Sequence, residues 1–286
     1  MTAPLATSSS PSVSTPPAPS DLARQVVVLV GAVLAALAGY WGSGAAGGTS
    51  QQEVGDGALA ADATPVAPGE PAFTIWSVIY LGLLAYAVWQ VLPAQRQDAR
   101  QRRTGWLVLV SMVLNAAWIG VVQADLIWLS LLVILAILAV LVITVRRLGE
   151  RAASGPLEAV VVDGTLGLYL GWVTVATVAN TFSVAVAAGV DARAAAADAW
   201  AVVALAVAGA AGVTHASWTR GRLTVGAAMV WGLAWVVVAR TTGDLRSTAA
   251  AVAAGVAALA VLIVTVVARS RRDRRRPDAH QAPALA

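Results

Sequence analysis

Three residues within one long apolar stretch, residues 157–186, are the first candidates for chemistry. Tyr169, Trp172 and Asn180 offer a phenol, an indole and a carboxamide. In a helix that turns about 100° per residue, Tyr169 and Asn180 lie within about 20° of each other, and Trp172 lies about 60° from Tyr169. Because lipid offers such groups no partner, this side is predicted to face other helices or a cavity. The spacing fits either hydrogen bonds between helices or a ligand pocket.

Two earlier apolar stretches carry similar residues. Phe73, Trp76 and Tyr80 are spaced three and four residues apart, which places them on one face of a helix. Asn115 and Trp118 are three residues apart in the next stretch, where an amide is costly unless it is paired. By their depth, the aromatic and amide groups of the three stretches meet in the outer half of a membrane. They predict an aromatic-lined cavity for a flat, largely apolar ligand.

Signals for catalysis and metal binding are sparse. The chain has no cysteine and two histidines, His215 and His280, so neither a disulfide nor a multi-histidine metal site is expected. Asp163 is the one acid that could lie inside a membrane segment, where it would suit a proton relay or be solvated near the interface. We therefore favour a binding protein over an enzyme. We assign no catalytic residue, no metal ligand and no required cofactor.

The composition places these stretches in a membrane protein. Of 286 residues, 58% are hydrophobic and 12% are charged, whereas a typical soluble domain has about 25% charged residues. A helix that crosses a bilayer takes about 20 apolar residues. Apolar runs cover residues 26–40, 73–92, 106–122, 126–145, 157–186, 200–213, 223–239 and 249–267. The sequence thus predicts an all-α, polytopic membrane bundle of about eight transmembrane helices.

Charge in the connecting loops predicts the orientation of the bundle. Arginine-rich loops alternate with arginine-free or mixed loops, and the chain has no lysine. The arginine-rich loops are 93–103, 146–156, 214–222 and 269–276, and the others are 42–71, 123–125, 188–199 and 240–247. Because positive residues favour the cytoplasmic side, both termini are predicted to be cytoplasmic, in a multi-pass protein of the plasma membrane. The net charge of +4 stems from these flanks and does not indicate nucleic-acid binding.

Four regions follow from this pattern. Residues 1–22 are predicted to be a disordered cytoplasmic N-terminus, and residues 23–187 a five-helix membrane domain. Residues 188–268 would form a further three-helix membrane segment. Residues 269–286 would be a basic cytoplasmic tail that binds anionic lipid headgroups or only sets orientation. The first apolar run could instead belong to a signal peptide, but it passes into Tyr40-Trp41, a pair typical of a retained span.

The first five spans resemble the TspO/MBR family, the tryptophan-rich sensory proteins whose animal members are the mitochondrial translocator proteins, or peripheral benzodiazepine receptors. Three motifs carry the resemblance. The fifth span has Tyr-Leu-x-Trp with an Asn eleven residues after the Tyr, and the third has Leu-Asn-x-x-Trp. The second has Trp-x-x-x-Tyr near its start and Tyr-x-x-Trp near its end. The matching residues are Tyr169, Leu170, Trp172, Asn180, Leu114, Asn115, Trp118, Trp76, Tyr80, Tyr86 and Trp89.

Members of that family bind porphyrins and related apolar ligands inside the five-helix bundle, and they are described as sensors, transporters or degraders of tetrapyrroles. The resemblance implies a ligand-binding site made of Trp76, Tyr80, Asn115, Trp118, Tyr169, Trp172 and Asn180. It implies membrane lipid and a tetrapyrrole-like ligand, such as a porphyrin or haem, as partners, and it allows a homodimer. A binding protein or sensor is the leading interpretation. The alternatives are a transporter of a small apolar solute, a porphyrin-degrading enzyme and a structural subunit.

Overall fold

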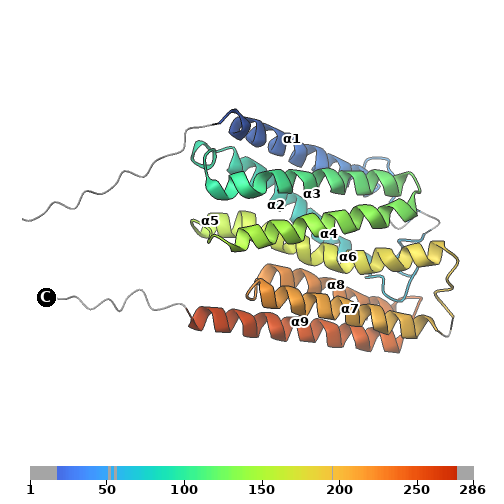
Figure 1. Ribbon diagram of the computed structural model, residues 1–286. Coiled ribbons are helices and arrows are strands. Elements are labelled where there is room, and N and C mark those ends of the chain that lie inside the picture. The colour runs from blue at the N-terminus through green and yellow to red at the C-terminus, as the bar shows by residue number, and fades with distance from the viewer. Residues whose placement is uncertain (1–17, 51–52, 55–56, 195, 276–286) are drawn as a thin grey trace, which may run out of the picture.

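The computed structural model describes residues 18–50, 53–54, 57–194 and 196–275. Within these ranges all regular structure is helical, and eight helices are long and apolar enough to cross a membrane. The helices run side by side in one bundle, and the described chain begins and finishes at the same end of it (Figure 1). The predicted all-α, polytopic architecture is therefore confirmed.

The spans follow one another along the chain, joined by loops and by short 3-10 helices. They are α1 (Pro19–Gly42), the 3-10 helix η1 (Glu70–Thr74), α2 (Ile75–Gln90), the 3-10 helix η2 (Pro93–Gln95), α3 (Ala99–Gln123), α4 (Ile127–Gly149), α5 (Pro156–Glu158), the π-helix η3 (Ala159–Gly164), α6 (Thr165–Ala187), α7 (Ala197–Trp218), α8 (Leu223–Thr242) and α9 (Thr248–Arg274). Elements α5, η3 and α6 together form one span.

The first helix begins inside the segment 1–22 that the sequence predicts to be disordered. Its first turn is stabilised by Asp21, whose carboxylate accepts a hydrogen bond from the amide of Ala18 at 3.0 Å and pairs with Arg102 of α3 at 2.5 Å. Pro19 at the first helical position also favours this start. Polar contacts thus extend α1 beyond the apolar run that predicted it. Residues 1–17 and 276–286 of the predicted terminal segments lie outside the described residues.

Two apolar cores meet at α6. One core joins α1, α2, α3, α4 and α6 and includes Val225 and Ala228 of α8, and the other joins α7, α8 and α9 and includes Val175 of α6. Helix α6 packs against α2 and α4 and also against α8. Close approach of α6 and α8 depends on small residues, since a Cβ added at Gly232 would lie 2.9 Å from Cγ1 of Val175. Helices α8 and α7 therefore pack directly onto the helix that carries Tyr169, Trp172 and Asn180, and α9 packs against α7 and α8.

Candidate functional site

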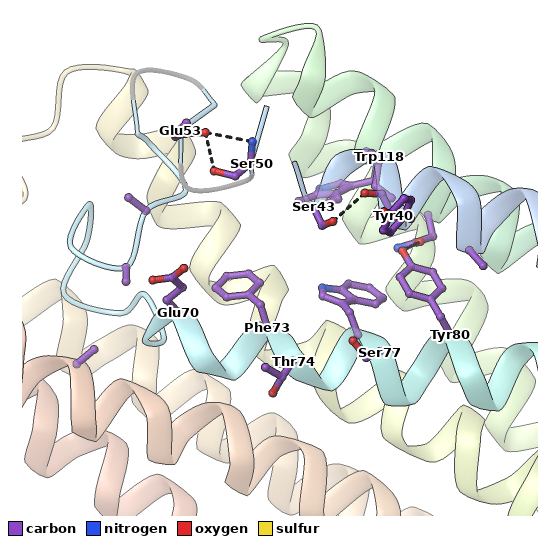
Figure 2. Close-up of a pocket in the computed structure, with 18 of the residues that line it drawn as sticks. Tyr40, Ser43, Ser50, Glu53, Glu70, Phe73, Thr74, Ser77, Tyr80 and Trp118 are labelled. Carbon is purple, nitrogen blue, oxygen red and sulfur yellow. Dashed lines mark hydrogen bonds between the residues drawn. The ribbon is translucent and has the colours of Figure 1, made fainter. Parts of the chain in front are cut away.

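A cavity of about 1100 Å³ opens at the end of the bundle that carries the α1–η1 loop, residues 43–69. It lies between α1, α2, α3, this loop and the C-terminal end of α8. Its volume lies just above the range typical of small-molecule sites, about 300–1,000 Å³. Five aromatic side chains line it: Tyr40, Phe73, Trp76, Tyr80 and Trp118. Figure 2 shows Phe73 and Tyr80 projecting from one side, with Tyr40 and Trp118 across from them.

The stacking wall of the cavity comes from η1 and α2. The rings of Trp76 and Tyr80 lie 5.5 Å apart at an interplanar angle of 23°, which is a stacked arrangement. This is possible because the two residues share a helix face. Gly39 of α1 also leaves the space that the Tyr80 ring fills, since a Cβ there would overlap the ring. The wall thus depends on a glycine in the neighbouring helix.

One amide in the cavity has a free donor. The hydroxyl of Tyr80 donates to Oδ1 of Asn115 at 2.7 Å, and both residues line the cavity. The amide NH₂ of Asn115 has no hydrogen-bond partner in the described part of the chain. Because Tyr80 occupies the oxygen side, the NH₂ group remains available beside the stacked rings.

Tyr169 and Trp172 lie behind the stacking wall rather than on the cavity surface. The edge-on contacts of Trp76 reach Tyr169 at 5.8 Å and Trp172 at 6.3 Å between ring centroids. Trp172 also meets Phe73 edge-on at 5.6 Å. The Tyr169 hydroxyl donates to the carbonyl of Ser111 at 3.2 Å. Both α6 side chains are fully buried, so they support the rings that face the cavity.

Asn180 connects three helices. Its Oδ1 accepts from Nε1 of Trp118 at 3.0 Å, and its Nδ2 donates to Oγ of Ser130 at 2.9 Å. The Ser130 hydroxyl in turn donates to the carbonyl of Ile127 at 2.6 Å. Asn180 therefore orients Trp118 in the cavity wall without lining the cavity itself.

The structure brings the seven predicted site residues into one cluster with two layers. Trp76, Tyr80, Asn115 and Trp118 line the cavity, while the other three predicted residues support them from α6. The sequence left two alternatives for the helix face of Tyr169 and Asn180, hydrogen bonds between helices or a ligand pocket. The structure shows hydrogen bonds between helices for both residues. That the cluster binds a ligand stays a prediction.

A family model described as TSPO-like protein matches residues 25–267. The chain belongs to this family. The match runs through all eight spans, beyond the five whose motifs carry the resemblance. No curated protein and no solved structure matches the chain.

Residues that the sequence motifs do not reveal also border the cavity of this TSPO-like protein. Arg240, near the end of α8, is 2% exposed and donates to the carbonyls of Thr64, at 3.0 Å, and Ala61. The amide of Gly69 donates to the carbonyl of Trp235 at 3.1 Å. Helix α8 therefore holds the described loop segment 57–69 at the border of the cavity. The sequence offered a weak signal for this contact, namely an arginine at the end of an apolar run facing an acidic loop.

The mouth of the cavity is acidic. Four carboxylates and one guanidinium line it: Glu53, Asp62, Glu70, Asp244 and Arg240. Three of these acids lie in residues 42–71, a stretch without arginine, whereas Asp244 lies in the α8–α9 loop. Because four carboxylates stand against one guanidinium, the mouth has an excess of negative charge.

The other candidates for chemistry lie away from this cavity. Asp163 pairs with Arg100 at 2.6 Å and with Arg222 at 2.5 Å, so its carboxylate joins spans near the opposite end of the bundle. His215 accepts from Nε1 of Trp218 at 3.1 Å through Nδ1, and its Nε2 faces Oγ1 of Thr174 at 3.2 Å. No group of three metal-binding side chains occurs among the described residues. His280 lies outside them.

Proposed function

We propose that this TSPO-like membrane protein binds a flat, largely apolar ligand of the tetrapyrrole class in the cavity of α1, α2, α3 and α8. The stacked pair Trp76 and Tyr80, beside the unpartnered NH₂ group of Asn115, carries the proposal. Stacked and edge-on rings contribute ~0.5–1.5 kcal/mol per pair beyond the area they bury. One amide donor adds direction, because it can reach an acceptor on the ligand.

Binding is the activity that the lining supports, and a sensing role is part of the proposal. The described lining residues include carboxylates, hydroxyls and amides, but no histidine, and the chain has neither cysteine nor lysine. The described lining does hold one hydroxyl beside a carboxylate, since Ser50 donates to Glu53 at 2.8 Å, but this hydrogen bond is solvent-exposed and belongs to the α1–η1 loop, not to the helix that carries the stacked rings.

We place the cavity on the outer side of the cell membrane. The loops at the opposite end of the bundle carry most of the arginines, and such loops favour the cytoplasm. Both ends of the described chain lie at that arginine-rich end (Figure 1). A ligand would then enter from the outer side, beneath the α1–η1 loop.

The acidic mouth favours a ligand without negative charge at its outer end. Protoporphyrin IX carries two propionates, whereas its dimethyl ester is neutral. Carboxylates facing Glu53, Asp62, Glu70 and Asp244 would meet like charge at the mouth. We therefore expect the dimethyl ester to bind more tightly than the free acid, and the difference to shrink at high salt because exposed charges are screened.

The proposal is tested by titrating purified protein in detergent against protoporphyrin IX and its dimethyl ester, following the ligand's Soret absorption. Trp76→Leu should raise Kd about tenfold or more, which corresponds to ~1.4 kcal/mol per factor of ten. Asn115→Leu should raise it by a similar factor. Trp200→Leu removes an equally large ring that is 62% exposed on α7 and should leave Kd unchanged.

Two outcomes would contradict the proposal. Non-saturating absorption changes of equal size in all four proteins would show partition into the detergent micelle instead of a site. Time-dependent loss of the Soret band with product formation, abolished by Trp76→Leu, would replace binding with degradation as the activity.

A further inference from the structure

A second cavity, of about 970 Å³, lies at the arginine-rich end of the bundle. One side is formed by the end of α4, the loop that follows it, α5 and η3. The other side is formed by the α7–α8 turn, the start of α8 and the end of α9. The cavity therefore lies on the seam between the first five spans and the last three.

The floor of this cavity is electrically balanced. Arg100 pairs with Glu158 at 2.7 Å and with Asp163 at 2.6 Å, and Arg222 pairs with Asp163 at 2.5 Å. The guanidinium of Arg100 also donates to the carbonyl of Leu148 at 3.2 Å. Two cations and two anions thus satisfy one another in the interior, as buried charges must. This cluster needs no ligand.

The rim, in contrast, is positive. Four further arginines line it from three parts of the chain: Arg146, Arg220, Arg269 and Arg272. The acid on the rim is Glu150, which pairs with Arg103 outside the cavity. Arg269 pairs with Asp273 in its own helix at 2.9 Å. Neither Arg146 nor Arg220 has a carboxylate partner among the described residues.

The backbone fixes the turn that carries Arg220 against α9. Arg220 has φ of 55°, and the following Gly221 has φ of 70°, a left-handed conformation that is uncommon for residues other than glycine. A Cβ at position 221 would overlap the backbone of α9 at Thr265 and Arg269. The turn is therefore docked on α9 in a strained conformation that brings Arg220 to the last turns of the helix carrying Arg269.

Arg146 approaches from the other side of the seam. Its guanidinium carbon lies 5.3 Å from the ring centroid of Trp218, a cation–π contact that orients the side chain. Its N–H groups have no hydrogen-bond partner in the described part of the chain. Cations from α4, from the α7–α8 turn and from α9 thus converge on one concavity, where like charges repel unless an anion lies between them.

We propose that this cavity binds a phosphate group, carried by an anionic phospholipid or by a soluble phosphate. Arginine presents paired N–H donors that match phosphate oxygens, and basic pockets between membrane helices are known to suit anionic headgroups. Leu223, half exposed at the start of α8, lines the same cavity and offers apolar surface next to the charged rim. A bound phosphate would bridge the two halves of the bundle across their seam.

The test measures the thermal stability and ligand occupancy of the full chain in a zwitterionic detergent. Phosphatidylglycerol, phosphatidylcholine and inorganic phosphate are added separately, and bound lipid is counted by native mass spectrometry. Wild type should retain phosphatidylglycerol and gain several degrees in Tm, with no gain from phosphatidylcholine. In the double variant Arg146→Gln, Arg220→Gln, the apparent Kd should rise at least tenfold.

A matched control removes the same charge elsewhere. Arg151 and Arg274 are exposed at the same end and do not line the cavity, so Arg151→Gln, Arg274→Gln should bind like wild type. Equal losses in both double variants would overturn the proposal in favour of diffuse attraction to a basic surface. Arg220→Gln alone, whose side chain lies exposed, provides a second variant should the first lose stability without lipid. Stabilisation by inorganic phosphate that displaces the lipid would support the site and identify the soluble source.

Discussion

The hydrogen bond between Trp118 and Asn180 shows how one residue behind the cavity controls another that lines it. Asn180 uses both atoms of its amide, one toward α3 and one toward α4. Without it, the buried indole N–H of Trp118 has no acceptor, and an unsatisfied buried donor costs about 1–3 kcal/mol.

Asn180→Ala should therefore lower the free energy of unfolding by ~1–3 kcal/mol and weaken ligand binding as well, because Trp118 loses its orientation. The measurements are unfolding in mixed micelles and the Soret titration. Thr181→Ala is the matched control, since its exposed hydroxyl only returns to the carbonyl of Thr177 in the preceding turn. Equal stability of both variants would mean that the Asn180 bonds contribute nothing.

For single residues, the sequence predicted which side chains cluster together. It did not predict which of them line the cavity and which lie behind the lining. Helical periodicity places Trp172 on the same side of its span as Tyr169 and Asn180. Because lipid offers no hydrogen-bond partners to their polar groups, this side is predicted to face the interior of the bundle. Periodicity does not say which neighbour covers the face. Trp76 comes between Trp172 and the cavity, a fact of packing between distant helices that no single stretch encodes.

Among the elements, the α1–η1 loop and α8 form the least predictable contact of the molecule. Hydropathy predicts spans, because twenty apolar residues have few alternatives to crossing a bilayer. A loop has no such period. Arg240, which donates to the carbonyls of Ala61 and Thr64, connects α8 to the loop that borders the cavity. Of the last three helices, α8 is thus the one that reaches the described lining.

Replacing that guanidinium tests the role. Arg240→Met keeps an unbranched, flexible side chain and removes the guanidinium donors, so the described loop residues 57–69 should exchange their amide hydrogens faster. The ligand should also dissociate faster, since the loop covers the cavity. Hydrogen exchange followed by mass spectrometry measures the first effect. Arg246→Met, at an exposed position in the α8–α9 loop, should leave exchange in residues 57–69 unchanged. Equal exchange in both variants would contradict the role of Arg240 in holding the loop.

On the scale of the whole molecule, the two halves of the bundle meet at α6. The loops at one end of the bundle are rich in arginine and those at the other end are poor in it. The alternation of arginine-rich and arginine-poor loops predicted an even number of spans, and the structure places both ends of the described chain together (Figure 1). The sequence could supply this much because hydropathy and loop charge are local properties. It could not supply the seam with its second cavity, which depends on how α9 meets the α7–α8 turn.

The absence of cysteine from the chain allows the orientation to be tested with single substitutions. Ala124→Cys, exposed in the α3–α4 turn, should react with a membrane-impermeant maleimide on intact cells. Ala152→Cys, exposed in the α4–α5 loop, should react only after permeabilisation, because its arginine-rich neighbourhood favours the cytoplasm. The reverse pattern would place the ligand cavity inside the cell.

Single cysteines in this cysteine-free chain also give the most direct test of the central claim, that the cavity beneath the α1–η1 loop is the ligand site. Ser77 lines the cavity beside Trp76, whereas Ala124 lies at the same end of the bundle outside it. The rate of alkylation by a bulky maleimide is measured for Ser77→Cys and Ala124→Cys, with and without protoporphyrin IX dimethyl ester. Saturable slowing at position 77 alone, with the concentration dependence of the Soret titration, is the predicted result. Unchanged alkylation at position 77 under saturating ligand would show that the ligand binds elsewhere.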